Sequence, residues 1–317
     1  MRLFCRKIDC MADPAPPDAL LSLLGFERSD PPSILYHYTS MQGLLSIVES
    51  GRIRATHIRF LNDWSEAETM WNLVRQRLHA RRELLKSQED RTFLTAILDL
   101  SEERVPHNDF LASFSEEGDD LTQWRAYCPS EPGFSIGFSS TALRSQWVSD
   151  PHGKSPSFVG AKLVKVRYVS ERDFSDLDTM IDSALALGRQ LHGSAGFGGR
   201  TLSKEQIAVG SFSVTAPIYK NAAFRAESEW RMILSKPHKP MPGLRFRPGK
   251  STIVPYVEVE LNMDLNYKLA EDYLIRKVIV GPTPNPMLSV EALKSLFISK
   301  EHPEVEVEQS SIPYRHW

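Results

Sequence analysis

An imidazole stands at a predicted junction between a strand and a helix near the start of the chain. Residues 34–38 are apolar and aromatic enough for a buried strand, and the apolar residues of 41–48 recur at helical spacing. Thr39 or Ser40 can cap that helix. Because free backbone N–H groups at a helix start suit anionic or hydroxyl-rich ligands, His37 is a candidate binding residue. A hydrogen-bonded structural histidine is the alternative.

Two carboxylates lie two residues apart in a second candidate segment. Residues 223–234 read as a strand entered through a loop, and the two-residue period places Glu227 and Glu229 on one face. Neighbouring carboxylates repel and raise each other's proton affinity unless ligand hydroxyls or cations compensate. They are therefore candidate catalytic residues. The alternative is a surface ladder of ion pairs with Arg225 and Arg231.

Strands and short helices must hold these groups in place. Further strands are predicted at 53–61, 110–115, 134–138, 162–169, 253–261, 275–281 and 305–308, and further helices at 65–78, 121–127, 139–147, 175–192, 203–214 and 288–299. The many strands, without strict alternation with helices, indicate an α+β fold with a largely antiparallel or mixed sheet. We expect an irregular or helical lead over 1–33 and one domain over 34–317, with a helical insertion at about 170–215.

Composition excludes several classes of protein. The chain has 317 residues, 41% of them hydrophobic, and a formal net charge of −2, which disfavours a generally cationic nucleic-acid coat. Cys5, Cys10 and Cys128 form no CxxC pair, so we expect no disulfide and a cytoplasmic protein. The sequence predicts no secretory leader, no membrane span and no metal site.

Five motifs together resemble the prokaryotic family called domain of unknown function 2971 (DUF2971). They are LYHYT at 35–39, FLND with Glu66 at 60–66, ASFSEEGDDLTQWRAY at 112–127, GFSIGF at 133–138 and ESEWR at 227–231. Their order along the chain carries the resemblance, which covers roughly residues 34–281. The name of this family gives no function.

A more distant resemblance is to ADP-ribosyltransferases, which bind NAD on a small split sheet. Their signatures of the His-Tyr-Glu or Arg-Ser-Glu kind recur here in order as His37, Ser113-Phe114-Ser115 and Glu227-x-Glu229. The resemblance implies an ADP-ribosyltransferase-like split sheet with flanking helices and cleavage of the bond between nicotinamide and ribose. A carboxylate near the sugar stabilises the oxocarbenium character of such a transition state.

The same resemblance implies roles for single residues. Glu229 would stabilise the transition state, and Glu227 would orient or deprotonate the incoming nucleophile. His37 would bind the adenosine ribose. The other NAD-binding candidates are Tyr38, Thr39, Ser113, Ser115 and Tyr127, of which Tyr38 or Tyr127 would stack on nicotinamide. The acceptor of ADP-ribose, whether protein or nucleic acid, or water in simple hydrolysis, stays open.

Two further hypotheses come from other classes. One is a noncatalytic nucleotide-binding or protein-interaction module, in which His37, Trp124, Glu229 and Arg231 hold the fold together. The other is a metal-dependent, nuclease-like effector that uses Asp63, Glu66 and Glu229. The sequence contains no GxxxxGK[ST] loop, HExxH or GxSxG motif, which disfavours an NTPase, a zinc hydrolase and a serine hydrolase.

Overall fold

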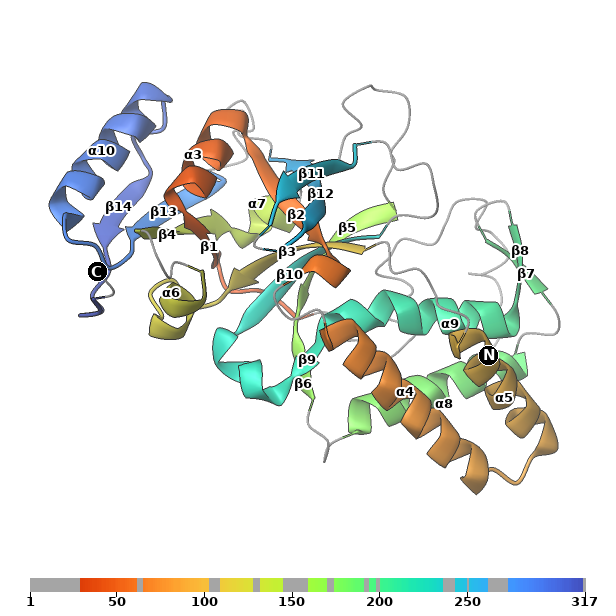
Figure 1. Cartoon of the computed structure of the whole chain (residues 1–317). Helices are drawn as coiled ribbons and strands as arrows, with labels where there is room; N and C mark the ends of the chain where they lie inside the picture. Colours follow the sequence, from red (N-terminus) through yellow and green to blue (C-terminus); the bar gives the residue numbers. More distant parts are fainter. Residues whose placement is uncertain are drawn as a thin grey trace. The chain divides into compact units, whose positions relative to one another are not determined.

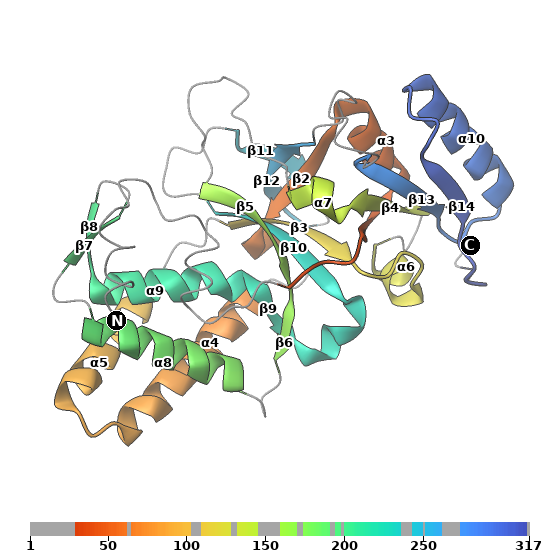
Figure 2. The ribbon, with the colours of Figure 1, turned by 180° about the vertical axis from the view of Figure 1, so that it is seen from behind.

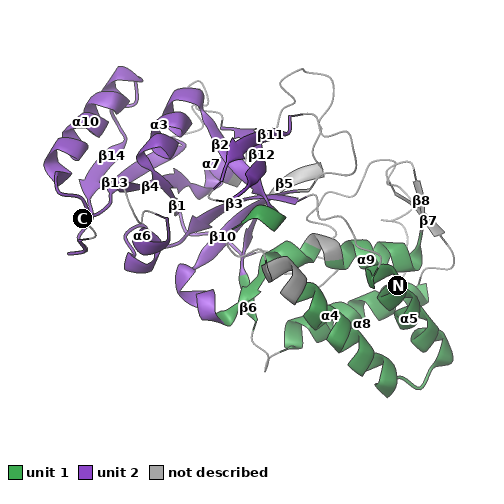
Figure 3. Ribbon diagram, in the orientation of Figure 1, with its two compact units in different colours: residues 1–28, 58–108, 167–222 green, residues 29–57, 109–166, 223–317 purple. Residues whose placement is uncertain are grey.

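The computed structural model of the chain consists of two compact units. The described residues are 29–61, 65–102, 109–127, 132–144, 159–169, 174–190, 194–197, 200–235, 243–249, 251–261 and 273–315, with no side chains described at 65–69, 144, 159–162, 194–197, 200–202, 213–214 and 235. Unit 1 contains residues 1–28, 58–108 and 167–222, and unit 2 contains residues 29–57, 109–166 and 223–317 (Figure 3). Each unit is described separately below.

Unit 2 is built on a ten-stranded sheet, and the predicted α+β class with a mixed, largely antiparallel sheet is confirmed. The pairs are antiparallel except β13–β14, which is parallel. The strands are β1 (Ile34–Ser40), β2 (Arg52–His57), β3 (Asp109–Ser115), β4 (Gly133–Ser139), β5 (Val159–Lys165), β10 (Glu229–Ser235), β11 (Arg245–Pro248), β12 (Ile253–Glu260), β13 (Ile275–Val280) and β14 (Glu306–Gln309).

The sheet forks at β3. One edge of β3 pairs with β10 along its whole length. The other edge pairs with β2 at Phe110 and Leu111, and with β1 at Ser115. We call the stretch of β3 between these contacts, residues 112–114, the fork. From it, β2–β12–β11 form one wing, the β11 wing, and β1–β4–β13–β14 form the other, the β14 wing.

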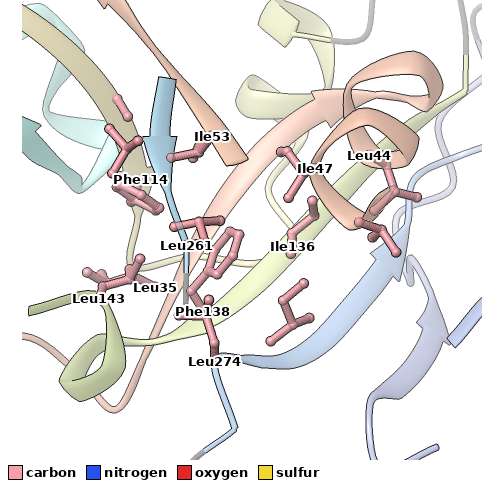
Figure 4. Packing of buried hydrophobic residues seen from close by; sticks show 14 of the residues in the cluster. Leu35, Leu44, Ile47, Ile53, Phe114, Ile136, Phe138, Leu143, Leu261 and Leu274 are labelled. Atoms are coloured by element: carbon pink, nitrogen blue, oxygen red, sulfur yellow. The ribbon is translucent and has the colours of Figure 1, made fainter. Parts of the chain in front are cut away.

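One face of the sheet carries the hydrophobic core of unit 2. Leu44, Ile47 and Val48 of helix α3 (Met41–Ser50) are buried in the same cluster as Leu35 and the other residues that Figure 4 labels. We call it the α3 face. Helices α7 (Ser140–Arg144) and α10 (Pro286–Ser299) add Leu143, Leu293 and Phe297 to this cluster. The predicted caps of α3 are confirmed, because Ser40 Oγ accepts from Gly43 N and Gly51 has a φ of 63°.

The opposite face is covered at one end by helix α6 (Leu121–Tyr127), and α3 and α6 lie on opposite sides of β1 and β4 (Figures 1 and 2). We call it the α6 face. Trp124 packs there with Tyr38 and Ile279. Cross-strand pairs share a face, so the pairs of Ser115 with Tyr36 and with Glu229, and of Ser113 with Arg231, put polar residues of three strands on it.

Unit 1 is mainly helical. Its elements are η1 (Ile58–Phe60), α4 (Ser65–Leu84), α5 (Gln88–Glu102), α8 (Ser175–Gln190), α9 (Lys204–Thr215) and η2 (Ala216–Ile218), with paired strands β6 (Arg167–Val169) and β9 (Tyr219–Asn221), and β7 (Ser194–Phe197) and β8 (Arg200–Ser203). Ion pairs join its helices: Arg77 of α4 contacts Asp178 of α8 at 2.6 Å, and Arg189 of α8 contacts Asp90 of α5 at 2.6 Å.

Several predicted elements differ from the structure. The predicted strand over 53–61 ends at His57, where η1 follows. The predicted strand over 223–234 is wrong at its start, because residues 222–227 form a 3-10 helix, η3. The predicted lead over 1–33 lies largely outside the described residues, as do Asp63 and the side chain of Glu66.

Helix α5 was not predicted, and in the structure residues 58–108 cluster with 167–222 in one compact unit. The predicted insertion at about 170–215 includes α8 and α9. Among the described residues, no helix is both long enough and apolar enough to cross a bilayer.

Candidate functional site

The strand that carries Glu229 begins at that residue. Glu227 ends η3, and Ser228 between them has a φ of 44°, which is uncommon for a residue with a side chain. Both backbone polar groups of Ser228 are hydrogen-bonded. Its N–H donates to the Arg225 carbonyl at 3.2 Å, and its carbonyl accepts from Glu116 N at 3.1 Å. The two carboxylates therefore do not share a strand face, and the predicted pairing of Glu227 with Glu229 on one strand is wrong.

The partner that Glu229 does have on its strand is Arg231. Arg231 Nε donates to Glu229 Oε1 at 2.8 Å, and an Nη donates to Oε2 at 3.1 Å. This is a side-on, bidentate pair, and the two side chains are 2% and 5% exposed. An ion pair with Arg231 was one of the two readings of the sequence, but the structure buries it, so it is not the surface ladder that this reading assumed.

A hydroxyl and an amide hold the backbone just ahead of this pair. Ser115 is buried, and its Oγ donates to the Glu227 carbonyl at 2.8 Å while it accepts from Glu117 N at 3.1 Å. Gln123 of α6, also buried, directs its Nε2 to the same carbonyl at 3.5 Å. Ser115 and Glu229 are direct partners in the register of β3 and β10. The structure thus brings the predicted residues Ser113, Ser115 and Glu229 together on the α6 face.

The side chain of His37, on β1, contacts the fork. Its Nδ1 lies 2.9 Å from the Ser113 carbonyl, and its ring centroid lies 5.7 Å from that of Phe114. A carbonyl only accepts, so Nδ1 carries the proton in this bond. Burial lowers the pKa of His37, and the bond to Ser113 opposes that shift. Burial thus favours the neutral imidazole, and the carbonyl partner places its proton on Nδ1.

The side chain of His37 does not share the face of Glu229. His37 pairs with the buried Ile136, whereas its neighbours Tyr36 and Tyr38 point to the α6 face. The imidazole on β1 and the carboxylate on β10 are therefore on strands that both pair with β3, but on opposite faces of the sheet. The contact of His37 with the adenosine ribose stays a prediction.

The two tyrosines proposed to stack on nicotinamide differ in access. The Tyr38 ring packs edge-on against Trp124 at 4.7 Å, its hydroxyl donates to the Glu117 carbonyl at 2.8 Å, and Asp120 N donates to it at 3.0 Å. Burial raises the pKa of this hydroxyl. Tyr127, at the end of α6, is 38% exposed and is the more accessible of the two. Thr39 lies partly buried at the end of β1.

Asp119 was missed from the sequence, where residues 116–120 read as an acidic turn. Its Oδ1 accepts from Trp124 Nε1 at 2.8 Å, and its Oδ2 accepts from the Ser311 N–H at 2.8 Å and from the Ser311 hydroxyl at 2.9 Å. Asp119 therefore fixes α6 to the segment after β14. Gln123 was missed for a related reason, since its amide reaches a carbonyl 104 residues further along the chain.

Within the described part of the chain, no three His, Cys, Asp or Glu side chains are grouped so that they could hold a metal ion. The carboxylates of the nuclease-like hypothesis include Asp63 and Glu66, whose side chains lie outside that part. That hypothesis stays a prediction.

The comparisons with known proteins agree with one of the two resemblances. Searches of curated proteins and of solved structures gave no match. Residues 123–232 match a family model described as "Protein of unknown function (DUF2971)". The matched segment includes Gln123, Glu229 and Arg231 of the α6 face, whereas Tyr36, Ser113 and Ser115 precede it. This match supports the assignment of the chain to the DUF2971 family.

Proposed function

We propose that the protein is an ADP-ribosyltransferase-like enzyme that cleaves the bond between nicotinamide and ribose in NAD, with Glu229 as its catalytic carboxylate. One observation carries the proposal: a buried carboxylate–guanidinium pair, Glu229–Arg231, on β10, next to the strand β3 at which the sheet divides. The three motifs of the distant resemblance lie on adjacent strands there, His37 on β1, Ser113 and Ser115 on β3, and Glu229 on β10.

The pair is costly to bury and adds little to the fold through its own contact. Removing two charges from water costs several kcal/mol per ion, and mutual attraction offsets this only with good geometry. Glu229 and Arg231 are two residues apart on one strand, so their contact closes no loop and joins no second element. Hydrophobic side chains would fill these positions at less cost. A buried, expensive pair of this kind is a functional-site candidate.

The chemistry of NAD cleavage needs such a carboxylate. When the C–N bond breaks, its electron pair leaves with nicotinamide and positive charge develops on the ribose, which an ionised carboxylate stabilises. The bidentate contact with Arg231 fixes the orientation of Glu229. In the proposed reaction an acceptor oxygen or water adds to the same carbon and loses its proton.

The other residues receive supporting roles. Glu227 is half-buried and lies outside the strand, where its carboxylate can take the proton of the nucleophile. Tyr127 is the accessible aromatic ring of α6 that can stack on nicotinamide. His37 acts as a positioning residue, because its bond to the Ser113 carbonyl fixes β3 at the point where neither wing pairs with it.

The test is nicotinamide release from NAD by the full-length protein. The wild type is expected to release nicotinamide, and Glu229→Gln to reduce the rate by at least about 100-fold, the size typical of removing one electrostatic interaction from a transition state. Asp90→Asn is the matched control, since it removes a buried carboxylate that is also paired with an arginine, in unit 1. Circular dichroism of each variant checks folding. A wild type that releases no nicotinamide contradicts the proposal.

The second candidate is a noncatalytic nucleotide-binding or interaction module. It is favoured by the low exposure of the pair and by the engagement of both oxygens of Glu229 with Arg231. Isothermal titration with NAD separates the candidates. A module binds NAD or a related nucleotide without consuming it, whereas the enzyme consumes NAD at a rate that depends on Glu229.

A further inference from the structure

The β11 wing carries four arginines on one face. In the register of its strands, Arg54 faces Glu258, Thr56 faces Tyr256, and Tyr256 faces Arg245, so alternate residues of the three strands share that face. Its arginines are Arg52, Arg54, Arg245 and Arg247. We call this surface the arginine face. The adjacent positions on the other side, such as Ile53 and Val257, are buried in the core.

Positive charge on the arginine face exceeds the negative charge beside it. Glu258 Oε2 lies 3.5 Å from Arg52 and 3.4 Å from Arg245, and it is opposite Arg54 in the register. One carboxylate thus contacts two guanidinium groups, while an Nη of Arg54 donates to Ser46 Oγ of α3 at 3.5 Å. Glu260 is the other carboxylate of the described strands on this face, which leaves four arginines against two acids. This local excess contrasts with the net charge of −2 for the whole chain.

The guanidinium group of Arg54 is stacked on an aromatic ring, and the residue is exposed. Its guanidinium carbon lies 5.2 Å from the centroid of the Tyr256 ring, and the ring itself is only 7% exposed. The guanidinium plane is therefore the part of this stack that a ligand can reach. Phe246 of the edge strand β11 alternates with Arg245 and Arg247, so it belongs to the opposite face of the sheet. The arginine face thus combines several guanidinium groups with one guanidinium plane that is stacked on a buried aromatic ring.

We propose that the arginine face binds single-stranded nucleic acid, with its phosphates on the arginines and a base stacked on the exposed plane of Arg54. Guanidinium groups match phosphate geometry, and stacking on arginine or aromatic planes is the usual mode for unpaired bases. A sheet face presents no helix or ribbon that would enter the groove of a duplex. An acidic peptide would use the charges but leave the stacking plane of Arg54 unused.

The arginine face and Glu229 are on the same face of the sheet. Thr56 of β2 pairs with Leu111 of β3, which alternates with Ser113 and Ser115, the partners of Arg231 and Glu229. A strand bound to the arginine face would lie on the α6 face of unit 2. The binding itself does not depend on NAD cleavage, so its test needs no active enzyme.

The test is fluorescence anisotropy of a labelled oligouridylate of about 20 nucleotides, titrated with the full-length protein. The variant is Arg54→Gln with Arg245→Gln, and the matched control is Arg276→Gln with Lys300→Gln, which removes two exposed positive charges elsewhere in unit 2. We expect the arginine variant to bind at least about tenfold more weakly near 0.1 M salt. The control is expected to bind within about twofold of the wild type.

Salt dependence gives a second, sharper readout. The slope of log K against log salt concentration is expected to fall by about 0.7 for each phosphate that the protein no longer neutralises, hence by about 1.4 in the arginine variant. Unlabelled duplex DNA, polyglutamate, and vesicles of phosphatidylserine and phosphatidylcholine serve as competitors. Competition by the unlabelled oligonucleotide alone supports the proposal.

Three results would overturn it. The first is a wild type that does not bind the oligonucleotide. The second is an arginine variant that binds as well as the control. The third is competition by duplex, polyglutamate or vesicles as strong as that by the unlabelled oligonucleotide, which would assign the surface to another anion.

Discussion

Both units contain a buried carboxylate paired with an arginine, and the two pairs are built differently. In unit 1, Asp90 of α5 contacts Arg189 of α8, and the side chains are 10% and 58% exposed. The contact joins two helices that are about a hundred residues apart in sequence. In unit 2, Glu229 and Arg231 are both buried and belong to the same strand.

The difference separates a pair that joins two elements from a pair that lies within a single strand. The Asp90–Arg189 contact fixes the packing of two helices, and its guanidinium keeps water as a neighbour, so its desolvation cost is small. The Glu229–Arg231 contact fixes no packing between elements and carries the cost of burying both charges. Architecture explains the first pair, and we propose that a site that needs a fixed carboxylate accounts for the second.

The largest expected effect comes from breaking the pair in unit 2. Arg231→Met leaves Glu229 buried without its guanidinium, and we expect it to lower the free energy of unfolding by about 3–5 kcal/mol. Glu229→Leu combined with Arg231→Met removes both charges and is expected to recover most of that loss. Urea denaturation followed by circular dichroism measures both. A double variant as unstable as the single one would show that the pair is needed for the fold itself.

The sequence predicts the strands of this site better than its geometry. Alternation in 110–115 and 134–138 marks β3 and β4 correctly, because each strand has one face in a core. The start of β10 was missed because Ala223–Glu227 has no glycine or proline to mark η3, and the break depends on Ser228 at a φ of 44°. The local sequence pattern could not predict the fork either, because the fork depends on which strands pair with β3.

The roles of single side chains were harder still to predict. The sequence predicts Tyr38 in a strand and Trp124 in a helix, but not that backbone groups of Glu117 and Asp120 would bind the Tyr38 hydroxyl. These contacts join segments about 80 residues apart. Sequence periodicity records which face a residue prefers, whereas partners across the chain are fixed by tertiary packing.

Acid is expected to have a smaller effect on stability, and to weaken unit 2 at a higher pH than unit 1. The pKa of His37 is lowered by burial, so its stabilising effect is complete above pH 6.5 and is lost as the pH falls through the lower folded value. The pKa of Asp90 is lowered mainly by its bond to Arg189, so its effect is complete above pH 3.8 and is lost only below it. Mild acid should therefore weaken unit 2 before unit 1.

Hydrogen exchange measured as protection factors at pH 7.5 and about 5.5 tests this order. Peptides that cover β3 are expected to lose protection in the wild type, by at most about 1.4 kcal/mol per pH unit for one proton. Peptides that cover α5 are expected to keep it. His37→Gln can still donate to the Ser113 carbonyl but does not titrate, so it should remove most of the difference in β3. Equal losses in both peptides would contradict a role for His37.

The smallest effect is expected from breaking the pair in unit 1. Arg189→Met is expected to lower the free energy of unfolding by about 1 kcal/mol, because the guanidinium is more than half exposed and its attraction to Asp90 is screened by solvent. Since exposed charges are also screened by ions, the difference from wild type should shrink when salt is raised to about 1 M, where the Debye length is about 3 Å. The loss of stability from Arg231→Met should persist under the same conditions, because neither partner contacts bulk solvent. Urea denaturation of the two variants at both salt concentrations measures this contrast. If the loss of unfolding free energy in Arg189→Met did not depend on salt, the two pairs would not differ in their screening by solvent.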